Sequence, residues 1–217
     1  MHILQQKIIA SLIKQPGLRF NKLRPEGVES NQFVYHLKVL MRDKLIKQTG
    51  NLYQLTVGGK QLADKLSYKD FRPRVQPKIV TMLVCKNSKG EYLWQKRTKE
   101  PFHGLVSFPY GKLHLGETIQ EAATRELQEK TNMAGKLQHT GDAYWLVYEN
   151  DELIIHVLCH LFRVNNPKLT KGLIIPPDCF WLALDKIDKT SLVPGIFELV
   201  KLKQPHLDQI VSVNIAK

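Results

Sequence analysis

The apolar residues of the first thirty positions repeat with helical spacing. Leu4, Ile8 and Leu12 recur at every fourth residue and predict a first helix, which the Pro-Gly pair at 16–17 closes. A short second helix is expected over residues 20–24, because a proline and a glycine follow it at 25 and 27. The start of the chain is therefore predicted to be mainly helical.

A third, amphipathic helix is expected from Ser30, whose side chain can cap it. Apolar residues form its buried side, namely Phe33, Leu37, Leu40 and Met41. Its solvent side is polar and cationic, and comprises Asn31, Gln32, Tyr35, His36, Lys38 and Arg42. Residues 46–55 read as two short strands around a turn, and a further helix starts after Thr56.

Beyond residue 78 the pattern changes to that of strands. Residues 79–85 are an apolar and β-branched run, residues 86–90 contain a turn, and residues 91–97 read as a second strand, so the segment predicts a hairpin. A glycine-punctuated loop then leads to a helix that Thr118 can cap. Apolar residues at helical spacing mark its buried side: Ile119, Ala122, Ala123 and Leu127. Paired strands over 145–164, a strand near 180–187 and a closing helix near 194–203 complete the prediction.

The stretch DFRPRVQPK separates these two patterns. It holds two prolines and three basic residues with little apolar content, which is typical of a linker. We therefore predict a first domain over residues 1–70, a linker over 71–78 and a second domain over 79–217.

Positive charge is concentrated ahead of this linker. The chain carries a net charge of +12, and residues 1–78 hold 15 Lys or Arg against 5 Asp or Glu. Residues 79–217 hold 17 against 15. Such asymmetry favours a nucleic-acid partner for the basic segment. A basic surface that serves only solubility is the alternative.

Cysteine usage and hydropathy favour the cytoplasm. Cys85, Cys159 and Cys179 form no C-x-x-C pair and are odd in number, which argues against a disulfide framework or a zinc finger. The N-terminal segment is interrupted by Gln5, Gln6 and Lys7 and lacks the apolar core of a signal peptide. The apolar run over 153–162 is too short to span a bilayer. We expect no membrane partner.

The first domain resembles a winged helix-turn-helix domain. The resemblance is carried by YHLKVLMRDKLI followed by LYQLTVGGKQLADKL. In that family the third helix lies in the major groove of DNA and the hairpin wing touches the backbone. The resemblance implies DNA contacts by the solvent side of the third helix and by the wing: Asn31, Gln32, Tyr35, His36, Lys38, Arg42 and Lys47. A protein-interaction module is the alternative.

Two carboxylates on the helix after residue 118 can bind a hard cation. Glu126 and Glu129 are three residues apart, so they share a helical face beside a glycine-containing loop. Such a pair suits magnesium that is also bound by substrate phosphates. Taken alone, the pair is also typical of an ordinary solvated helix edge.

A longer pattern in the same segment resembles the Nudix box. Gly111, five residues, Glu117, seven residues and then the run Arg125-Glu126-Leu127-x-Glu129 match it. Two positions depart from the box, because Lys130 replaces a glutamate and Asn132 replaces a glycine. The resemblance covers residues 79 to about 203. With the first domain it implies an α+β chain: a winged helix followed by a Nudix α/β/α sandwich with a mixed sheet.

The Nudix resemblance implies hydrolysis of nucleoside diphosphates linked to another moiety, with magnesium or manganese. Carried over to this chain, Glu126 and Glu129 are metal ligands, and the backbone of Gly111 also faces the metal. Arg125 orients a neighbouring glutamate, and Glu117 is its structural partner. These three acidic and basic side chains, Glu126, Arg125 and Glu129, are the candidate catalytic residues.

Lys130 sits where the family has a principal metal ligand. A protonated lysine has no lone pair to offer and repels a cation, so reduced or absent hydrolysis is favoured. Because Glu126 precedes Lys130 by four residues, we expect an ion pair between them. Lys130, Lys112 and Tyr110, which replaces the glycine usual before Gly111, are the expected ligand-pocket residues.

Two functions remain open from the sequence. The first is a transcriptional regulator that binds DNA and senses a nucleotide-like effector, with a homodimer as its expected form. The second is a magnesium-dependent pyrophosphohydrolase with an accessory winged helix, in which a loop acid replaces the lost ligand. Four acids are candidates for that replacement: Glu149, Asp151, Glu152 and Asp178.

Other residues with potential chemistry favour structural roles. His156 and His160 share one face of a predicted strand, but without a third ligand they are expected to be core or rim residues. Trp94, Trp145 and Trp181 lie in apolar strand patterns and are expected to pack in the core.

Overall fold

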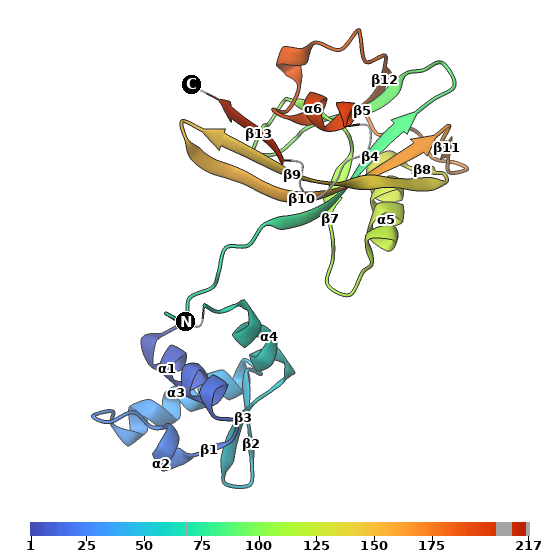
Figure 1. Cartoon of the computed structure of the whole chain (residues 1–217). Coiled ribbons are helices and arrows are strands. Elements are labelled where there is room, and N and C mark those ends of the chain that lie inside the picture. The colour runs from blue at the N-terminus through green and yellow to red at the C-terminus, as the bar shows by residue number, and fades with distance from the viewer. Residues whose placement is uncertain (68, 203–209, 216–217) are drawn as a thin grey trace. The chain divides into compact units, whose positions relative to one another are not determined.

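The computed structural model describes residues 1–67, 69–202 and 210–215. The chain forms two compact units, Met1–Gln76 and Pro77–Lys217 (Figure 1). Residues 203–209 and 216–217 of the predicted second domain lie outside the described part. Within the described part, no helix combines the length and the apolar character needed to cross a bilayer.

In the described part of the first unit, the chain forms four helices and a three-stranded antiparallel sheet. The helices are α1 (Ile3–Lys14), α2 (Phe20–Leu23), α3 (Ser30–Arg42) and α4 (Val57–Lys65). The strands are β1 (Leu18–Arg19), β2 (Ile46–Thr49) and β3 (Leu52–Leu55), in the order β1-β3-β2. Each helix and the β2–β3 hairpin lie where the sequence predicts them.

Apolar side chains from α1 and α3 form the core of the first unit. Ile8, Ile9 and Phe33 are fully buried, and Leu37 and Leu40 pack with them. These are the positions that helical spacing assigns to the buried faces, which confirms the period of the pattern.

Two predictions for α3 are wrong. The N-cap is Glu29, because Ser30 is already helical and its hydroxyl accepts a hydrogen bond from Arg24 instead. His36 is buried rather than exposed, since its ring stacks on the ring of His2 with 4.3 Å between centroids. Burial lowers the pKa of His36, and the nearby His2 lowers it further.

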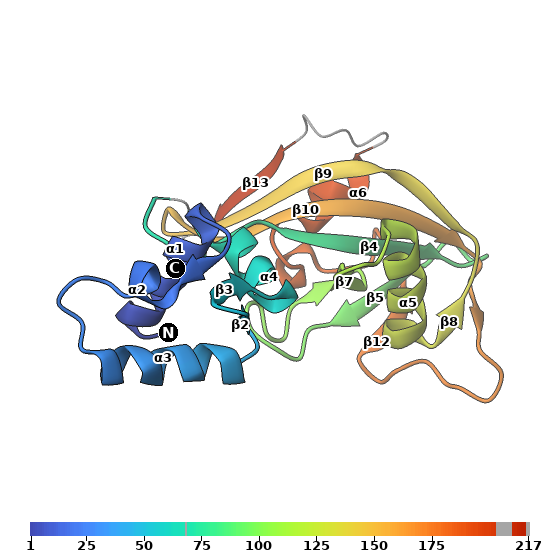
Figure 2. The same cartoon turned by 90° about the horizontal axis from the view of Figure 1, so that it is seen from below.

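The second unit is built on a mixed sheet with the strand order β12-β5-β4-β10-β9-β13 (Figure 2). The strands are β4 (Lys78–Lys86), β5 (Tyr92–Lys96), β9 (Leu137–Glu149), β10 (Glu152–Asn165), β12 (Cys179–Leu182) and β13 (Ile210–Ile215). Strand β10 runs parallel to β4 and antiparallel to β9, and β13 runs parallel to β9. Strands β6 (Val106–Ser107) and β7 (Tyr110–Lys112) pair with β5 and β4. Two further short strands, β8 (Met133–Ala134) and β11 (Lys168–Leu169), pair with each other.

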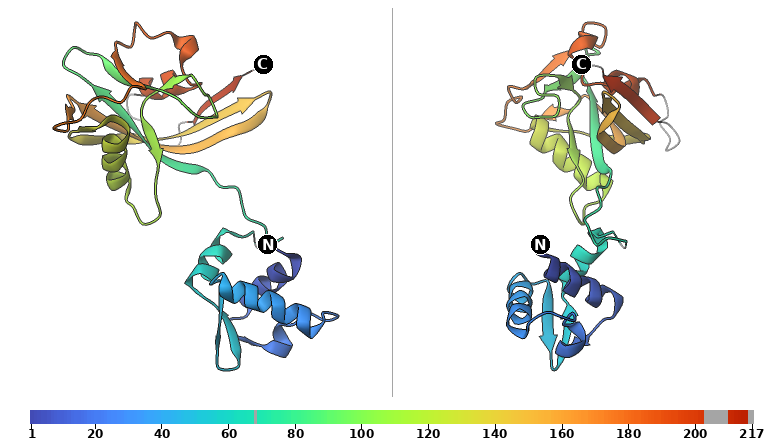
Figure 3. Two further views of the ribbon diagram at one scale, coloured as in Figure 1. Left: turned by 180° about the vertical axis from the view of Figure 1, so that it is seen from behind. Right: turned by 90° about the vertical axis from the view of Figure 1, so that its left-hand side faces the viewer.

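Helices cover both faces of this sheet (Figure 3). Helix α5 (Ile119–Thr131) packs through Ala123 and Leu127 on Leu83 and Phe162. On the other face, α6 (Ile196–Lys201) packs in a core with Trp94 and Trp145, both fully buried as predicted. Trp181 is only half-buried, beside the α5 core. A 3-10 turn over Lys189–Ser191 precedes α6.

Both ends of α5 are fixed by local chemistry. Thr118 caps its N-terminus, as predicted, in a reciprocal capping box with Glu121. At the other end Asn132 adopts the left-handed conformation with φ 56° and ψ 25°. Asparagine tolerates this conformation better than most residues, so Asn132 can replace the glycine of the Nudix box without changing the turn.

Candidate functional site

Arg125 is the centre of a cluster of three carboxylates. Its Nε and Nη2 donate to the two oxygens of Glu117 at 2.6 and 2.9 Å. Its Nη1 donates to Glu126 Oε1 at 2.7 Å and to Glu129 Oε2 at 3.1 Å. Nη2 also donates to the backbone carbonyl of Lys112 at 3.1 Å. One guanidinium thus joins α5, the loop before it and β7.

Gly111 makes room for the carboxylate of Glu126. A Cβ atom at Gly111 would lie 1.7 Å from Glu126 Cδ, which no side chain can tolerate. The φ of Gly111 is not positive, so the requirement is for space rather than for an unusual backbone. Glu126 is accordingly 4% exposed, whereas Glu129 at the outer side of the cluster is exposed.

The charges of this cluster are strongly coupled. Hydrogen bonds from Arg125, followed by one from the backbone of His114, lower the pKa of Glu117 to about 2. The hydrogen bonds to Glu117, and then those to Glu126 and Glu129, raise the pKa of Arg125. Three acids around one cation leave excess negative charge, which favours a cation at this place.

The donor set fits a magnesium ion in part. Glu126 Oε2 is buried and lacks a hydrogen-bond partner, although its other oxygen is bonded to Arg125. An orphaned, buried carboxylate oxygen beside a second carboxylate is the kind of hard ligand that magnesium prefers. The box as it stands supplies one buried carboxylate with a free oxygen, Glu126, and one exposed carboxylate, Glu129.

Lys130 takes a different position from the one expected. Glu126 forms its ion pair with Arg125, and among the ion pairs of the described residues none joins Glu126 to Lys130, so that prediction is wrong. Lys130 is half-buried, and its charge acts on Cys179, whose thiol donates to the Lys130 carbonyl at 3.4 Å. Burial and then Asp178 raise the pKa of Cys179 to about 12, and Lys130 opposes them.

Of the four candidate replacement acids, three are far from this cluster. Glu149, Asp151 and Glu152 lie at the tip of the β9–β10 hairpin. Along β10, Glu152 precedes His160 by eight residues, roughly 26 Å, and His160 is level with Gly111 of the cluster because both pair with Thr81. Asp178 lies next to Cys179 and accepts a hydrogen bond from Gln95 at 2.8 Å. It is the candidate nearest to Lys130.

Tyr110 does not face the carboxylate cluster. It pairs in register with Met82, and its ring packs edge-on against Trp145 in the core on the α6 side. Its hydroxyl accepts a hydrogen bond from Arg97, and burial raises its pKa. Because alternate residues of a strand face opposite sides, Tyr110 and Gly111 cannot line the same pocket. Lys112 is exposed at the end of β7.

The first unit presents most of its candidate DNA-binding residues to solvent. On α3 the exposed ones are Asn31, Gln32, Tyr35, Lys38 and Arg42, and on β2 Lys47 is exposed. His36 is the exception because it is buried. Arg42 forms an exposed ion pair with Asp43 at 3.1 Å, and the structure provides no other partner for its guanidinium among the described residues.

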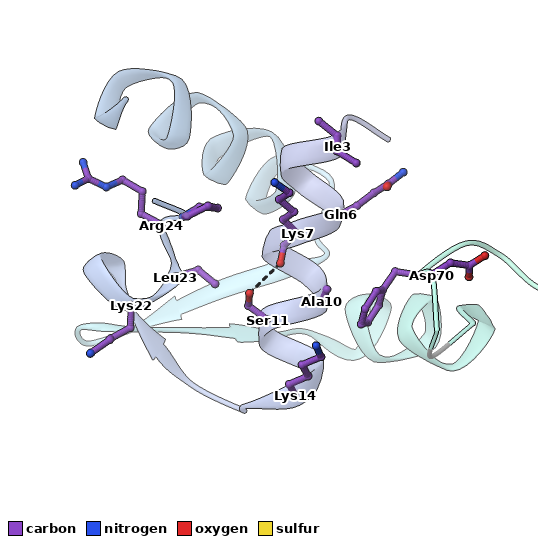
Figure 4. A pocket seen from close by; sticks show the side chains of 12 residues that line it. Ile3, Gln6, Lys7, Ala10, Ser11, Lys14, Lys22, Leu23, Arg24 and Asp70 are labelled. Atoms are coloured by element: carbon purple, nitrogen blue, oxygen red, sulfur yellow. Dashed lines mark hydrogen bonds between the residues drawn. The ribbon is translucent and has the colours of Figure 1, made fainter. Parts of the chain in front are cut away.

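A cavity of about 390 Å³ lies elsewhere on the first unit (Figure 4). It is lined by α1, by residues 22–25 and by residues 70–71. Four cations border it: Lys7, Lys14, Lys22 and Arg24. Its lining includes no residue of α3, so it is separate from the exposed side of that helix.

A histidine cluster escaped the sequence analysis. His160 does not act with His156; its Nδ1 lies 2.5 Å from Asp142 Oδ1, and His139 Nε2 lies 2.7 Å from the same oxygen. Of the three residues only His160 stands out in the sequence, because the cluster requires strand pairing that a pattern of single residues does not reveal.

Comparison with known proteins places the second unit in a family. A model of the NUDIX domain matches residues 76–202. The ADP-ribose pyrophosphatase of Methanocaldococcus jannaschii is 30% identical over 103 residues, 45% of this chain and 60% of that protein. The ADP-ribose pyrophosphatase of Saccharomyces cerevisiae is 41% identical over 61 residues, 27% of this chain and 26% of that protein. The RNA pyrophosphohydrolase of Hamiltonella defensa is 35% identical over 97 residues, 43% and 52% respectively. The chain thus spans at most three fifths of these relatives.

Two solved structures illustrate the structural similarity. A NUDIX hydrolase from Nitrosomonas europaea has a TM-score of 0.44 and 17% identity, covering 79% of this chain and 93% of that one. The NUDIX domain of Shewanella oneidensis NrtR, solved with ADP ribose, has a TM-score of 0.48 and 15% identity, covering 67% and 96%.

Proposed function

This chain belongs to the Nudix domain family through residues 76–202, and we propose that it is a DNA-binding regulator that senses a nucleoside diphosphate-linked ligand in that domain. The observation that carries the proposal is the altered set of metal ligands in the Nudix box. Lys130 supplies no ligand, and the two remaining carboxylates are both bonded to Arg125. Such a site retains the means to hold a charged ligand while it has lost a principal ligand for the catalytic metal.

The ligand class follows from the family and from the chemistry of the site. The curated relatives include enzymes named ADP-ribose pyrophosphatase and RNA pyrophosphohydrolase, and both names denote cleavage of a phosphoanhydride bond. Lys112 and Lys130 can meet the charge of a diphosphate, and a magnesium ion would add to them. We choose ADP-ribose as the first ligand to test.

A magnesium ion would be held by Glu126, Glu129 and the backbone carbonyl of Gly111. When bound, such an ion polarises a phosphoryl oxygen and neutralises the charge of the diphosphate. Arg125 holds both carboxylates in position through its Nη1 hydrogen bonds, and Glu117 fixes Arg125 through two further hydrogen bonds. Gly111 keeps the space that Glu126 occupies.

The DNA-binding function rests on the first unit, which we assign as a winged helix-turn-helix domain over residues 1–70, joined to a sensor domain over 79–217 by a linker over 71–78. The exposed amides of α3 suit base edges in the major groove, and its cations suit phosphates. Lys47 on the β2–β3 hairpin provides a backbone contact in the manner of a wing. A homodimer on a palindromic site is the expected form of such a regulator.

A selection from random duplexes tests the DNA-binding function. We expect the full chain to enrich a defined sequence, and fluorescence anisotropy on that duplex to change when ADP-ribose is added. Lys38→Glu and Arg42→Glu should abolish binding, whereas Lys89→Glu, an exposed lysine in the β4–β5 turn, should leave it intact. Failure to enrich any sequence, or binding that survives both α3 variants, would contradict the proposal.

A working hydrolase is the second candidate. The orphaned Oε2 of Glu126 favours it, because this oxygen is available to a metal even without a ligand at position 130. Asp178 is the acid best placed to assist, since it adjoins Cys179, which contacts Lys130. Magnesium-dependent turnover by the native protein, lost in Glu126→Gln, would establish this function instead.

A further inference from the structure

The sheet face that carries the Nudix box also carries a second cluster of ligating side chains. Asp142 on β9 pairs in register with His160 on β10, and His160 pairs with Thr81 on β4. Thr81 in turn pairs with Gly111 on β7. With strands about 4.8 Å apart, His160 lies roughly 10 Å from Gly111. The cluster is therefore separate from the box, because metals that act as a pair lie about 4 Å apart.

A β-bulge brings His139 to the same face as Asp142. In a regular strand, residues three apart point to opposite faces. Here the pairing shifts at Thr140, so that Phe162 opposes His139 and Leu161 opposes Gly141. Thr140 is the extra residue, and its hydroxyl donates to the Leu161 carbonyl at 3.1 Å. Bulges of this kind redirect side chains and are frequent beside functional sites.

Three ligand atoms converge as a result. His139, Asp142 and His160 each offer one nitrogen or oxygen, and these atoms lie within 4.8 Å of one another. We propose that they form a binding site for a divalent transition metal, with zinc as the best match, in a fold whose known chemistry uses oxygen-bound magnesium. Two imidazoles and one carboxylate are a donor set that suits zinc and is poor for magnesium.

The geometry needs only a small opening to accept the ion. Ligand atoms that surround zinc tetrahedrally at about 2.0–2.1 Å are about 3.3 Å apart. The two imidazole nitrogens now lie 2.5 and 2.7 Å from one Asp142 oxygen, so each must move by less than about 1 Å. The side chains of His139 and Asp142 are 36% and 25% exposed. A fourth position therefore opens to solvent, as in zinc sites that bind water or a substrate.

Titration of the tag-free, chelator-treated full chain tests the site. We expect Zn²⁺ to bind by calorimetry at one ion per chain, Co²⁺ to give the visible absorption of a tetrahedral complex, and Mg²⁺ not to compete. His160→Gln and His139→Gln should each weaken Zn²⁺ binding by more than about 100-fold. Loss of a residue that only hydrogen-bonds to a metal ligand weakens binding by about 10- to 100-fold. Asp142→Asn provides a third, nearly isosteric variant.

Two matched controls locate the binding. His156→Gln changes a half-buried histidine on the same sheet face that is not part of the cluster, and it should bind Zn²⁺ like the native protein. Glu126→Gln disables the box and should also bind normally. No Zn²⁺ binding by the native chain, or equal loss in His156→Gln, would overturn the site and leave the cluster as a hydrogen-bonded structural element. Zn²⁺ should raise the melting temperature of the native protein but not that of folded His160→Gln.

Discussion

The two polar clusters on one face of the sheet are built with opposite arrangements of charge. In the first, the Arg125 cation lies among three carboxylates. Arg125, Glu126 and Glu129 project from α5, and Glu117 lies in the loop before it. In the second, the Asp142 carboxylate lies between two imidazoles on paired strands. The first cluster can be seen as a motif because helical spacing is local. The second depends on pairing across strands and on a bulge, so spacing along the chain does not reveal it.

The largest effect should come from removing the cation of the first cluster. Arg125→Met removes the ion-pair partner of the buried Glu126 and leaves Glu117 only its contacts with His114. Loss of one partner of a buried ion pair costs about 3–5 kcal/mol. Because the Arg125 side chain is 20% exposed, we expect the lower end, about 3 kcal/mol, in urea unfolding at neutral pH. Arg42→Met removes an exposed pair and should cost less than about 1 kcal/mol. Equal costs would mean that the cluster is no more than a surface feature.

The second-largest effect on stability should come from filling the space between Gly111 and Glu126. Gly111→Ala places a methyl group where the carboxylate now lies and should destabilise the protein by about 1–3 kcal/mol. In a Glu126→Ala background the same substitution should cost much less, because the clash is gone. A double-mutant cycle by denaturant unfolding measures this coupling. Additive effects would contradict the packing of Glu126 over Gly111.

The second cluster should contribute less to stability. Asp142→Asn removes the charged acceptor that both histidine rings contact, and we expect a loss of about 1 kcal/mol in the free energy of unfolding. Burial opposes the ionised form of Asp142, but the hydrogen bonds from His160 and His139 prevail and lower its pKa. His156→Gln serves as the control. A loss as large as that of Arg125→Met would remove the contrast between the clusters.

The smallest effect concerns acid stability. The pKa of Glu117 is about 2 in the folded protein, below its ordinary value, so Glu117 stabilises the fold above the unfolded-state pKa. This contribution is lost as the pH falls from about 5 toward 2. The melting temperature of Glu117→Gln should therefore lie below that of the native protein at pH 6, and the gap should close on acidification. A gap that stays constant would exclude this linkage.

Much of the fold follows from the sequence because local signals agree. The α1 stripe, the Thr118 cap and the strand pair that forms β9 and β10 lie where the pattern predicts them. Strand β13 lies outside the predicted elements, because it forms by parallel pairing with β9, which is distant in the sequence. His36 was misassigned because its burial depends on stacking with His2 on another helix end.

The site was only partly predictable for the same reason. The Nudix motif identifies Arg125 and its glutamates, since they lie on one helix and the loop before it. The motif does not specify which face of the sheet a strand side chain occupies. The sequence therefore places Tyr110 beside the box, whereas the structure places it on the opposite face. The Lys130 side chain was expected to pair with Glu126, but Arg125 is closer and holds that carboxylate.

The most direct test of the account restores the missing carboxylate. Purified native protein, Lys130→Glu and the double variant Lys130→Glu with Glu126→Gln are incubated with ADP-ribose and Mg²⁺, and AMP formation is followed by chromatography. Binding is measured separately by calorimetry. The account predicts that native protein binds ADP-ribose without forming AMP, that Lys130→Glu forms AMP, and that the double variant does not. Robust turnover by the native protein that Glu126→Gln abolishes would contradict it.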